Sequence, residues 1–302
     1  MEIFGPIERK RCLRIMLRLR RRWALIPMII GDAMTWLKRW TTSGREKPKV
    51  GRNKRVYAVG DIHGRLDLLD DLLDRIVSHS EAAPANNVLV FLGDYIDRGA
   101  NSQGVIERLV SIRKYLPGWK VVPLRGNHEQ AALQFLGDPN FYCNWRSYGA
   151  AETLLSYGVM PPRFAREADY IRARDDFASK CPHEHLQFIS QLQHYHVEDD
   201  YLFVHAGVRP GVALWDQLPE DLLSIREDFL LHRKNFGRMI VHGHTPAPLP
   251  VKLPNRICID TGAHATGRLT AIVLEGENQS FLDVATNERS PSVLHHLAAM
   301  GL

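Results

Sequence analysis

The chain has 302 residues, of which 45% are hydrophobic and 24% charged, a composition typical of a globular enzyme and unlike that of a disordered or membrane-embedded protein. Its net charge of +5 is uneven: residues 1–55 carry 16 lysines and arginines against 4 acidic residues, and the remainder has a net charge of −7. The basic character therefore belongs to the N-terminus, and the four widely spaced cysteines, without a Cys-x-x-Cys pair, argue against a disulfide framework or a thiolate zinc site.

The first predicted element is a cationic amphipathic helix at residues 11–23. At about 100° per residue, one side carries Cys12, Met16, Leu19 and Trp23, and the other carries Arg11, Arg14, Arg18, Arg21 and Arg22. Such a helix can lie on an anionic membrane surface, and the same charges bind nucleic acid without sequence preference. A targeting signal, or translation that begins at Met28 or Met34, are the alternatives. The apolar stretch that follows is too short for the roughly 20 residues of a membrane-spanning helix.

Residues 41–55 have the composition of a linker. We therefore predict a basic N-terminal extension and linker at 1–50, a catalytic domain at 51–287 and a C-terminal tail at 288–302.

Three apolar runs, 55–59, 87–92 and 119–124, predict β-strands with helical patterns between them. The first two runs are followed by Gly-Asp and the third by Arg-Gly-Asn, and both Asp61 to Asp94 and Asp94 to Asn127 span 33 positions. One strand with its crossover helix needs about 30 residues. The strands are thus predicted to be parallel, and the polar residues after them converge at one edge of the sheet, where ligands bind in α/β proteins.

In the second half of the chain the predicted secondary structure changes twice, first to helices without strands and then back to strands. Residues 128–193 are helical and aromatic without a good strand pattern, and strands return at 201–207, 238–245, 256–260 and 269–276. The sequence therefore predicts an α/β protein with mixed β-sheets flanked by helices and a helical segment beside the site.

Five short motifs follow the predicted strands, and each pairs glycine with a side chain that can bind metal. In chain order they are GDIHG (60–64), GDYIDRG (93–99), GNHE (126–129), HAG (205–207) and HGHT (242–245). Oxygen and imidazole ligands without thiolate suit manganese, iron or zinc. With these motifs the chain resembles the phosphoprotein phosphatase family of calcineurin-like metallophosphoesterases, particularly bacterial members similar to the bacteriophage lambda serine/threonine phosphatase. The resemblance covers about residues 55–276.

The resemblance implies a role for each motif position. Asp61 and His63 correspond to ligands of a first metal ion, Asp94 to a carboxylate that bridges two ions, and Asn127, His205 and His244 to ligands of the second. His128 corresponds to the catalytic histidine, Asp97 to its orienting partner, and Arg98 and Arg226 to phosphate-binding arginines. Ser224 departs from the pattern, because similar bacterial sequences carry tryptophan there. His242 is interpreted as a structural histidine, and Tyr95 as either a cleft wall or a packing residue.

The expected function is a dimetal phosphomonoesterase that acts on phosphoserine and phosphothreonine, and also phosphotyrosine, in proteins. Two divalent ions, manganese first and iron or zinc as alternatives, present a bridging hydroxide for direct attack on phosphorus. Arginines stabilise the phosphoryl charge. A serine alkoxide leaves poorly, so His128 protonates it while Asp97 holds the ring. No covalent phosphoenzyme is needed.

Two other functions remain open from the sequence. A hydrolase of dinucleoside polyphosphates, such as diadenosine tetraphosphate, shares the motifs, but members of that group usually lack the aspartate at position 97. A non-enzymatic module could use the basic arm to bind nucleic acid or membrane, although it would need none of the five motifs. We expect a cytoplasmic protein with phosphoprotein or phosphopeptide substrates, peripheral contact with anionic membrane through residues 11–23, and no specific nucleic acid.

Overall fold

The computed structural model describes residues 47–81, 86–163 and 166–286 of the chain. The predicted amphipathic helix at 11–23, the rest of the extension up to residue 46 and the predicted tail at 288–302 lie outside the described residues. All described residues belong to one compact unit that begins at Lys47.

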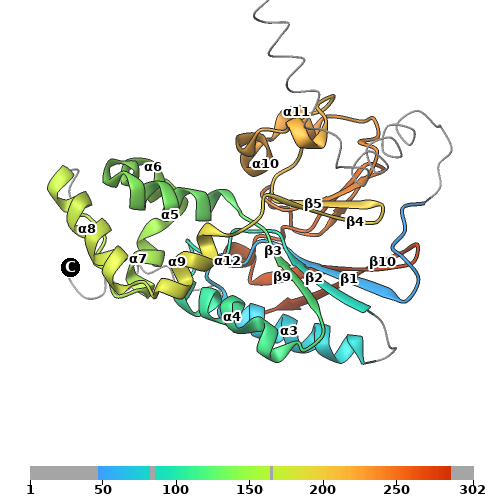
Figure 1. Cartoon of the computed structure of the whole chain (residues 1–302), viewed down its shortest axis with the longest axis horizontal. Helices are drawn as coiled ribbons and strands as arrows, with labels where there is room; N and C mark the ends of the chain where they lie inside the picture. Colours follow the sequence, from blue (N-terminus) through green and yellow to red (C-terminus); the bar gives the residue numbers. More distant parts are fainter. Residues whose placement is uncertain (1–46, 82–85, 164–165, 287–302) are drawn as a thin grey trace, which may run out of the picture. The chain divides into compact units, whose positions relative to one another are not determined.

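The first sheet contains the predicted β-α-β-α-β unit (Figure 1). Its strand order is β10-β9-β1-β2-β3. Strands β1 (Lys54–Val59), β2 (Asn86–Phe91) and β3 (Lys120–Pro123) are parallel, and β9 (Arg268–Glu275) and β10 (Asn278–Ala285) are antiparallel. Helices α3 (Leu66–Ser80) and α4 (Ser102–Tyr115) form the two crossovers. The predicted convergence of the strand ends is therefore confirmed.

Strand β1 is apolar from Val56 to Val59 because both of its faces are buried there. Tyr57 and Val59 pack with the leucines of α3, whereas Val56 and Ala58 pack against the second sheet. Alternate side chains of a strand point to opposite faces, and a parallel sheet covered on both sides loses the usual polar alternation.

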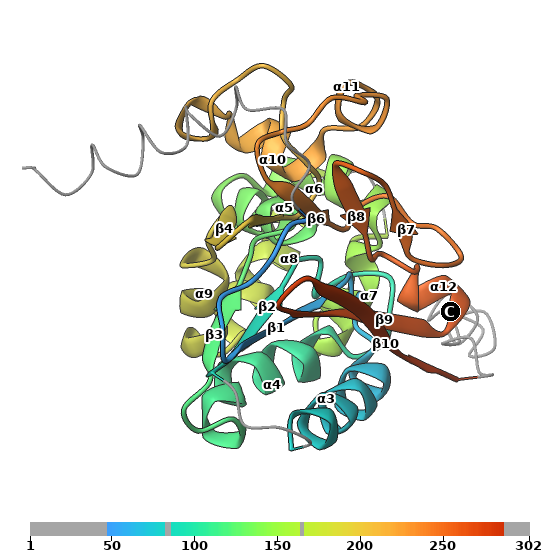
Figure 2. The ribbon, with the colours of Figure 1, turned by 90° about the vertical axis from the view of Figure 1, so that its right-hand side faces the viewer.

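The second sheet has the order β4-β5-β6-β8-β7. Its strands are β4 (Tyr195–Glu198), β5 (Tyr201–Val204), β6 (Met239–His242), β7 (Val251–Lys252) and β8 (Arg256–Cys258). The short helices α10 (Pro219–Ser224) and α11 (Glu227–Leu230) cover its outer face, where Leu222 and Phe229 pack against Leu202 and Ile240. Figure 2 shows the resulting layers, with α3 and α4 on one side and α10 and α11 on the other.

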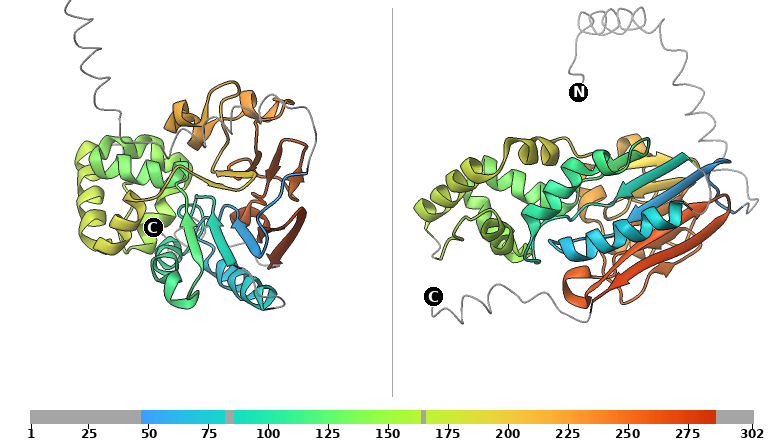
Figure 3. Two further views of the ribbon diagram at one scale, coloured as in Figure 1. Left: turned by 45° about the vertical axis from the view of Figure 1, so that its right-hand side comes forward. Right: turned by 90° about the horizontal axis from the view of Figure 1, so that it is seen from below.

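A helical segment lies beyond one end of the sheets (Figures 1 and 3). It comprises α5 (Asn127–Gly137), α6 (Tyr142–Trp145), α7 (Ala150–Ser156), α8 (Glu167–Lys180) and α9 (His183–Ser190), with 3-10 turns at Pro139–Phe141 and Arg146–Tyr148. Because α5 begins directly after β3, this segment forms one wall of the region where the strands end. The predicted fold class and helical segment are confirmed. None of the helices in the described part of the chain has the length and apolar character that crossing a bilayer requires.

Candidate active site

The loop after β1 places Asp61 and His63 at the strand ends. His63 has φ 48°, and its Nδ1 lies 2.9 Å from the carbonyl oxygen of Ile96. Since a carbonyl can only accept, Nδ1 carries the proton and Nε2 presents a lone pair, 3.5 Å from Oδ2 of Asp94. The backbone N–H of His244 donates to Oδ2 of Asp61 (3.0 Å), while the buried Oδ1 of Asp61 has no partner among the described residues.

Asp94 lies at the centre of the site. Its carboxylate oxygens are 3.5 Å, 3.6 Å and 3.4 Å from Nε2 of His63, His128 and His205, respectively. Burial alone would raise the pKa of Asp94, but the neighbouring histidines, His128 first, hold it below its usual range. A Cβ on Gly126 would lie 2.1 Å from Oδ1 of Asp94, so the glycine of GNHE is needed for this close approach.

Asn127, His205 and His244 form the other side of the site. Nδ1 of His205 donates to the carbonyl of Leu92 (2.9 Å), so its Nε2 lone pair faces Oδ1 of Asn127 at 3.0 Å. Two acceptors facing each other need a cation or a proton between them. His244 has φ 63°, and its buried Nε2 has no partner in the described part of the chain.

These donors fit divalent metal ions. Geometry alone brings together His63, Asp94 and His128, and separately Asp94, His205 and His244, as groups whose donor atoms lie within 4.8 Å of one another. The unpartnered atoms of Asp61 and His244 and the facing acceptors of Asn127 and His205 are the atoms that an ion would satisfy. All six predicted metal ligands thus converge at the strand ends, and their roles as ligands remain a prediction.

His128 and Asp97 form a buried dyad behind Asp94. Nδ1 of His128 donates to Oδ2 of Asp97 at 2.7 Å. The same carboxylate accepts from Nε1 of Trp145 (2.8 Å) and from the Thr153 hydroxyl (2.5 Å). Burial alone would lower the pKa of His128, but Asp94 and Asp97 outweigh it and raise that pKa above its usual value. The geometry matches the predicted pairing of a proton donor with an orienting carboxylate.

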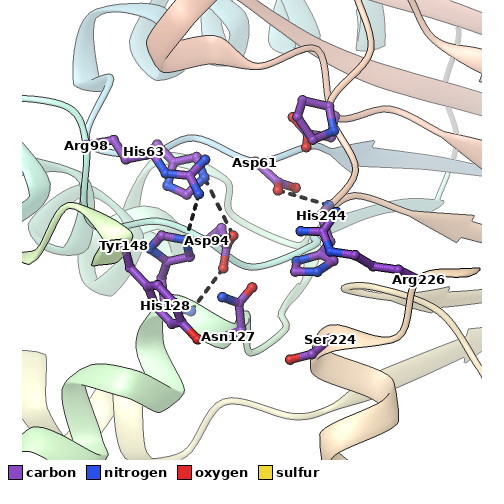
Figure 4. Close-up of a pocket in the computed structure, with 12 residues that line it drawn as sticks. Asp61, His63, Asp94, Arg98, Asn127, His128, Tyr148, Ser224, Arg226 and His244 are labelled. Carbon is purple, nitrogen blue, oxygen red and sulfur yellow. Dashed lines mark hydrogen bonds and ion pairs between the residues drawn. The ribbon is translucent and has the colours of Figure 1, made fainter. Parts of the chain in front are cut away.

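A cavity of about 380 Å³ opens above these residues. It is lined by Asp61, His63, Asp94, Arg98, Asn127, His128, Tyr148, Ser224, Arg226, His244, Pro246 and Asp260. Figure 4 shows Arg98 and Arg226 on opposite sides of the cavity. Nη2 of Arg98 lies 3.4 Å from Nε2 of His128. The guanidinium of Arg226 is exposed, without a hydrogen bond to any residue that the structure describes.

Two residues that we singled out lie outside the reactive surface. His242 is buried against Phe229, with ring centroids 4.9 Å apart, and its Nδ1 lies 3.0 Å from the carbonyl of Gly243. Tyr95 is fully buried and donates its hydroxyl to the carbonyl of Leu124 at 2.6 Å. Tyr95 is therefore a packing residue, and the burial and hydrogen bond of His242 agree with a structural role, which stays a prediction.

Sequence reasoning missed four residues that support the site: Tyr148, Trp145, Glu129 and Asp260. The buried carboxylate of Glu129 accepts backbone N–H bonds from Asp94 (2.9 Å), Tyr95 (2.7 Å) and Gly126 (2.9 Å), and so ties two loops together. Burial raises the pKa of Asp260 to about 6. Asp260 is the last residue of the predicted strand at 256–260, much as Asp61 comes just after β1, and this signal could have identified it.

Known proteins resemble this chain over most of its length. The model of the calcineurin-like phosphoesterase family matches residues 54–273. The asymmetrical bis(5'-nucleosyl)-tetraphosphatase PrpE of Bacillus thuringiensis is 28% identical over 241 residues, which cover 71% of this chain and 88% of the relative. The PrpE of Anoxybacillus flavithermus is 28% identical over 227 residues, with the same coverage.

Solved structures share the fold. A provisionally assigned diadenosine tetraphosphatase superposes with a TM-score of 0.54 and 21% identity, covering 80% of this chain and all of that one. A hypothetical protein of Pyrococcus horikoshii superposes with a TM-score of 0.50 and 15% identity, covering 82% of this chain and 94% of that one.

Proposed function

Because the chain belongs to the calcineurin-like phosphoesterase family, we propose that it is a metal-dependent hydrolase of dinucleoside polyphosphates. The family accounts for the predicted metallophosphoesterase fold and for hydrolysis at phosphorus. The narrower prediction, a serine/threonine protein phosphatase of the bacteriophage lambda type, gains no support from the relatives named above, which are tetraphosphatases.

One observation carries the proposal: Asp94 lies between two groups of potential metal ligands, under a cavity with an arginine on either side. Asp61 and His63 would hold one ion with Asp94, and Asn127, His205 and His244 the other. When bound, such ions polarise phosphoryl oxygens and lower the pKa of water towards neutrality. Manganese is the proposed metal, with iron and zinc as alternatives.

The chain's own residues supply binding and proton transfer. Arg98 and Arg226 line opposite sides of the cavity, so they can grip phosphoryl oxygens at two places, which suits a polyphosphate chain. Nε2 of His128 lies beside Arg98, at 3.4 Å from Nη2, where it can donate a proton to a departing oxygen. Asp97 fixes the tautomer of His128 through Nδ1 and stabilises its charged form.

Similarity to tetraphosphatases over 88% of their length outweighs the single aspartate that favoured a phosphomonoesterase. The phosphoprotein phosphatase remains a second candidate because of the His128–Asp97 dyad. Protonation by such a dyad matters most when the leaving oxygen is a strongly basic serine alkoxide.

The test compares three substrates in one manganese-containing buffer: diadenosine tetraphosphate, a phosphoserine peptide and nitrophenyl phosphate. We expect the highest kcat/KM for diadenosine tetraphosphate, with ATP and AMP formed in equal amounts, as asymmetrical cleavage requires. A higher kcat/KM for the phosphoserine peptide would favour the second candidate. Full activity after exhaustive chelation would exclude both.

A further inference from the structure

Asp260 follows β8 in the second sheet, and Asp61 follows β1 in the first. The two strand ends approach so closely that a Cβ on Gly60 would lie 2.4 Å from the carbonyl oxygen of Ile259. Both carboxylates are buried, with 2% of Asp61 and 4% of Asp260 exposed, and both line the cavity. The close approach of the two strand ends therefore places two buried acidic side chains in the same cavity wall.

The hydrogen bonds of Asp61 and Asp260 do not neutralise the negative charge of the two carboxylates. Oδ1 of Asp260 accepts from the backbone N–H of Gly262 at 2.8 Å. Oδ2 of Asp61 accepts from His244, while Oδ1 of Asp61 has no partner in the described part of the chain. Neither carboxylate forms a salt bridge with a lysine or arginine among the described residues. Two neighbouring buried carboxylates repel each other unless a cation lies beside them.

We propose that Asp260 is a positioning residue that orients the Asp61 carboxylate and adds negative charge to the metal site formed with His63. The proposal rests on the proposed function, because it requires that Asp61 binds a metal ion. Asp260 then has opposite effects in two states of the protein. Without the ion it destabilises the fold through repulsion, and with the ion it strengthens binding.

The discriminating variant is Asp260→Asn in the full chain. Its amide oxygen can still accept from Gly262, and its N–H₂ can donate to Asp61, so repulsion becomes a hydrogen bond without a change in size. With chelator present, at about pH 8, we expect the midpoint of thermal unfolding to rise by about 2–4 °C. By calorimetric titration with Mn²⁺ alone, we expect binding to weaken by about 10- to 100-fold.

Asp175→Asn is the matched control, because Asp175 lies on α8, away from the cavity, and pairs with its neighbour Arg174. Asp175→Asn should change neither the midpoint of thermal unfolding in chelator nor the affinity for Mn²⁺. A lower midpoint for Asp260→Asn with unchanged affinity would overturn the proposal and leave Asp260 as a cap for Gly262.

Two further outcomes separate the proposals. If the wild-type protein did not bind Mn²⁺, the proposed function itself would fail; normal wild-type binding with an unchanged variant would overturn only the role of Asp260. If Asp260→Asn did not fold, Asp61→Asn would remove the same repulsion from the other side. Its midpoint in chelator should then rise, and a fall would count against the proposal.

Discussion

Five residues of the site have a positive φ angle: His63, Asp94, Asp97, Arg98 and His244. Seven non-glycine residues of the described chain have this conformation, so the site holds most of them. Each such residue costs about 1–3 kcal/mol and persists only where the surroundings enforce it. Here the turns point the side chains back over the strand ends, and contacts such as those of Glu129 with the backbone of Asp94 and Tyr95 hold the loops in place.

The first prediction concerns His128 as proton donor. General-acid assistance is worth roughly 10²–10⁴-fold, and its value depends on the basicity of the departing oxygen. His128→Ala should lose about this factor on a phosphoserine peptide. It should lose much less on nitrophenyl phosphate or diadenosine tetraphosphate, whose leaving groups are weaker bases. Single-turnover rates on the three substrates measure the difference.

Two other variants serve as controls for His128. Asp97→Asn should show the same pattern more mildly, because Asp97 only orients and charges the imidazole. Arg98→Ala should reduce all three rates alike, because it would grip the phosphoryl group that the substrates share. Equal losses for His128→Ala on every substrate would assign that residue to phosphate or water positioning instead.

The second prediction concerns Asp94 as the shared ligand. Because its oxygens face His63 on one side and His205 on the other, Asp94→Asn should weaken both ions at once. Mutation of a residue that only hydrogen-bonds to a metal ligand typically lowers activity by roughly 10–100-fold. Activity of Asp94→Asn should fall by more than this. Calorimetric titration with Mn²⁺ should show both sites weakened, whereas Asp61→Asn should weaken one. Two tight sites in Asp94→Asn would disprove the bridging role.

At the scale of elements, the sequence predicted most accurately those strands whose side chains are buried on both faces of the sheet. The run at 55–59 lies within β1, and the run at 269–276 coincides with β9 within one residue at either end. The runs at 201–207 and 238–245 were predicted too long, because β5 ends at Val204 and β6 at His242. The residues after these strands belong to the site, where the backbone turns to direct side chains into the cavity.

Three strands were missed for a different reason. Strand β10 is a largely exposed edge strand with a polar sequence, and β7 has two residues. Strand β4 has four residues, and Tyr195 and His196, with which it begins, are only half-buried. Edge strands gain their pairing from tertiary contacts, which a local pattern of hydrophobicity does not reveal.

The third prediction uses two glycines that bracket α5. Gly126 precedes the helix and approaches Asp94, whereas Gly137 ends it, and a Cβ added at Gly137 would meet no atom within 4 Å. Gly126→Ala should reduce kcat/KM by about 10²-fold, because a displacement of about 1 Å at the reacting groups costs that much. Gly137→Ala should keep full activity and match or exceed wild-type stability by up to about 1 kcal/mol. Equal activity in both variants would refute the steric argument.

The fourth prediction concerns the contact between the sheets at Glu198. His196 donates to its carboxylate at 3.0 Å, Lys120 at 2.9 Å, and Lys54 also donates to it. The hydrogen bond from His196 and then those from the lysines outweigh burial and hold the pKa of Glu198 far below its usual value. A depressed carboxyl pKa gives stability that is fully present above the unfolded pKa of roughly 4.3 and is lost as the pH falls towards the folded pKa.

Glu198→Gln should therefore lower the free energy of unfolding at pH 7 by about 1–2 kcal/mol. The difference from wild type should shrink as the pH falls below roughly 4. Urea denaturation in chelator across this range measures both. A difference that is independent of pH would mean that packing, rather than charge, explains the effect.

At the scale of the whole molecule, the sequence predicted the positions that converge because parallel strands bring them to one edge. Asp61, Asp94 and Asn127 follow β1, β2 and β3, and their spacing required no knowledge of the second sheet. Trp145 and Asp260 could not be placed in this way. Trp145 reaches Asp97 from the helical segment, and Asp260 shares the cavity wall with Asp61 only because the strand ends of the two sheets approach each other.

The last prediction concerns where the N-terminal extension can be cut. Every residue that lines the cavity lies between Asp61 and Asp260, so deletion of residues 1–46 should leave hydrolysis of nitrophenyl phosphate nearly unchanged. If residues 11–23 form the predicted cationic helix, the same deletion should abolish binding to anionic vesicles in a flotation assay. Unchanged vesicle binding after deletion would exclude that helix as the membrane contact.

Deletion through residue 50 should behave differently, because residues 48–50 pack on the domain. Val50 is buried and donates its N–H to Gly276 (2.9 Å), and the carbonyl of Pro48 accepts from the Tyr201 hydroxyl (3.1 Å). Loss of the Val50 side chain and these bonds should cost about 2–3 kcal/mol. Urea denaturation should thus separate the two deletions while their rates at low temperature stay alike. Equal stability would mean that the contacts of Val50 contribute nothing, and equal loss of activity would mean that the extension itself supports the site.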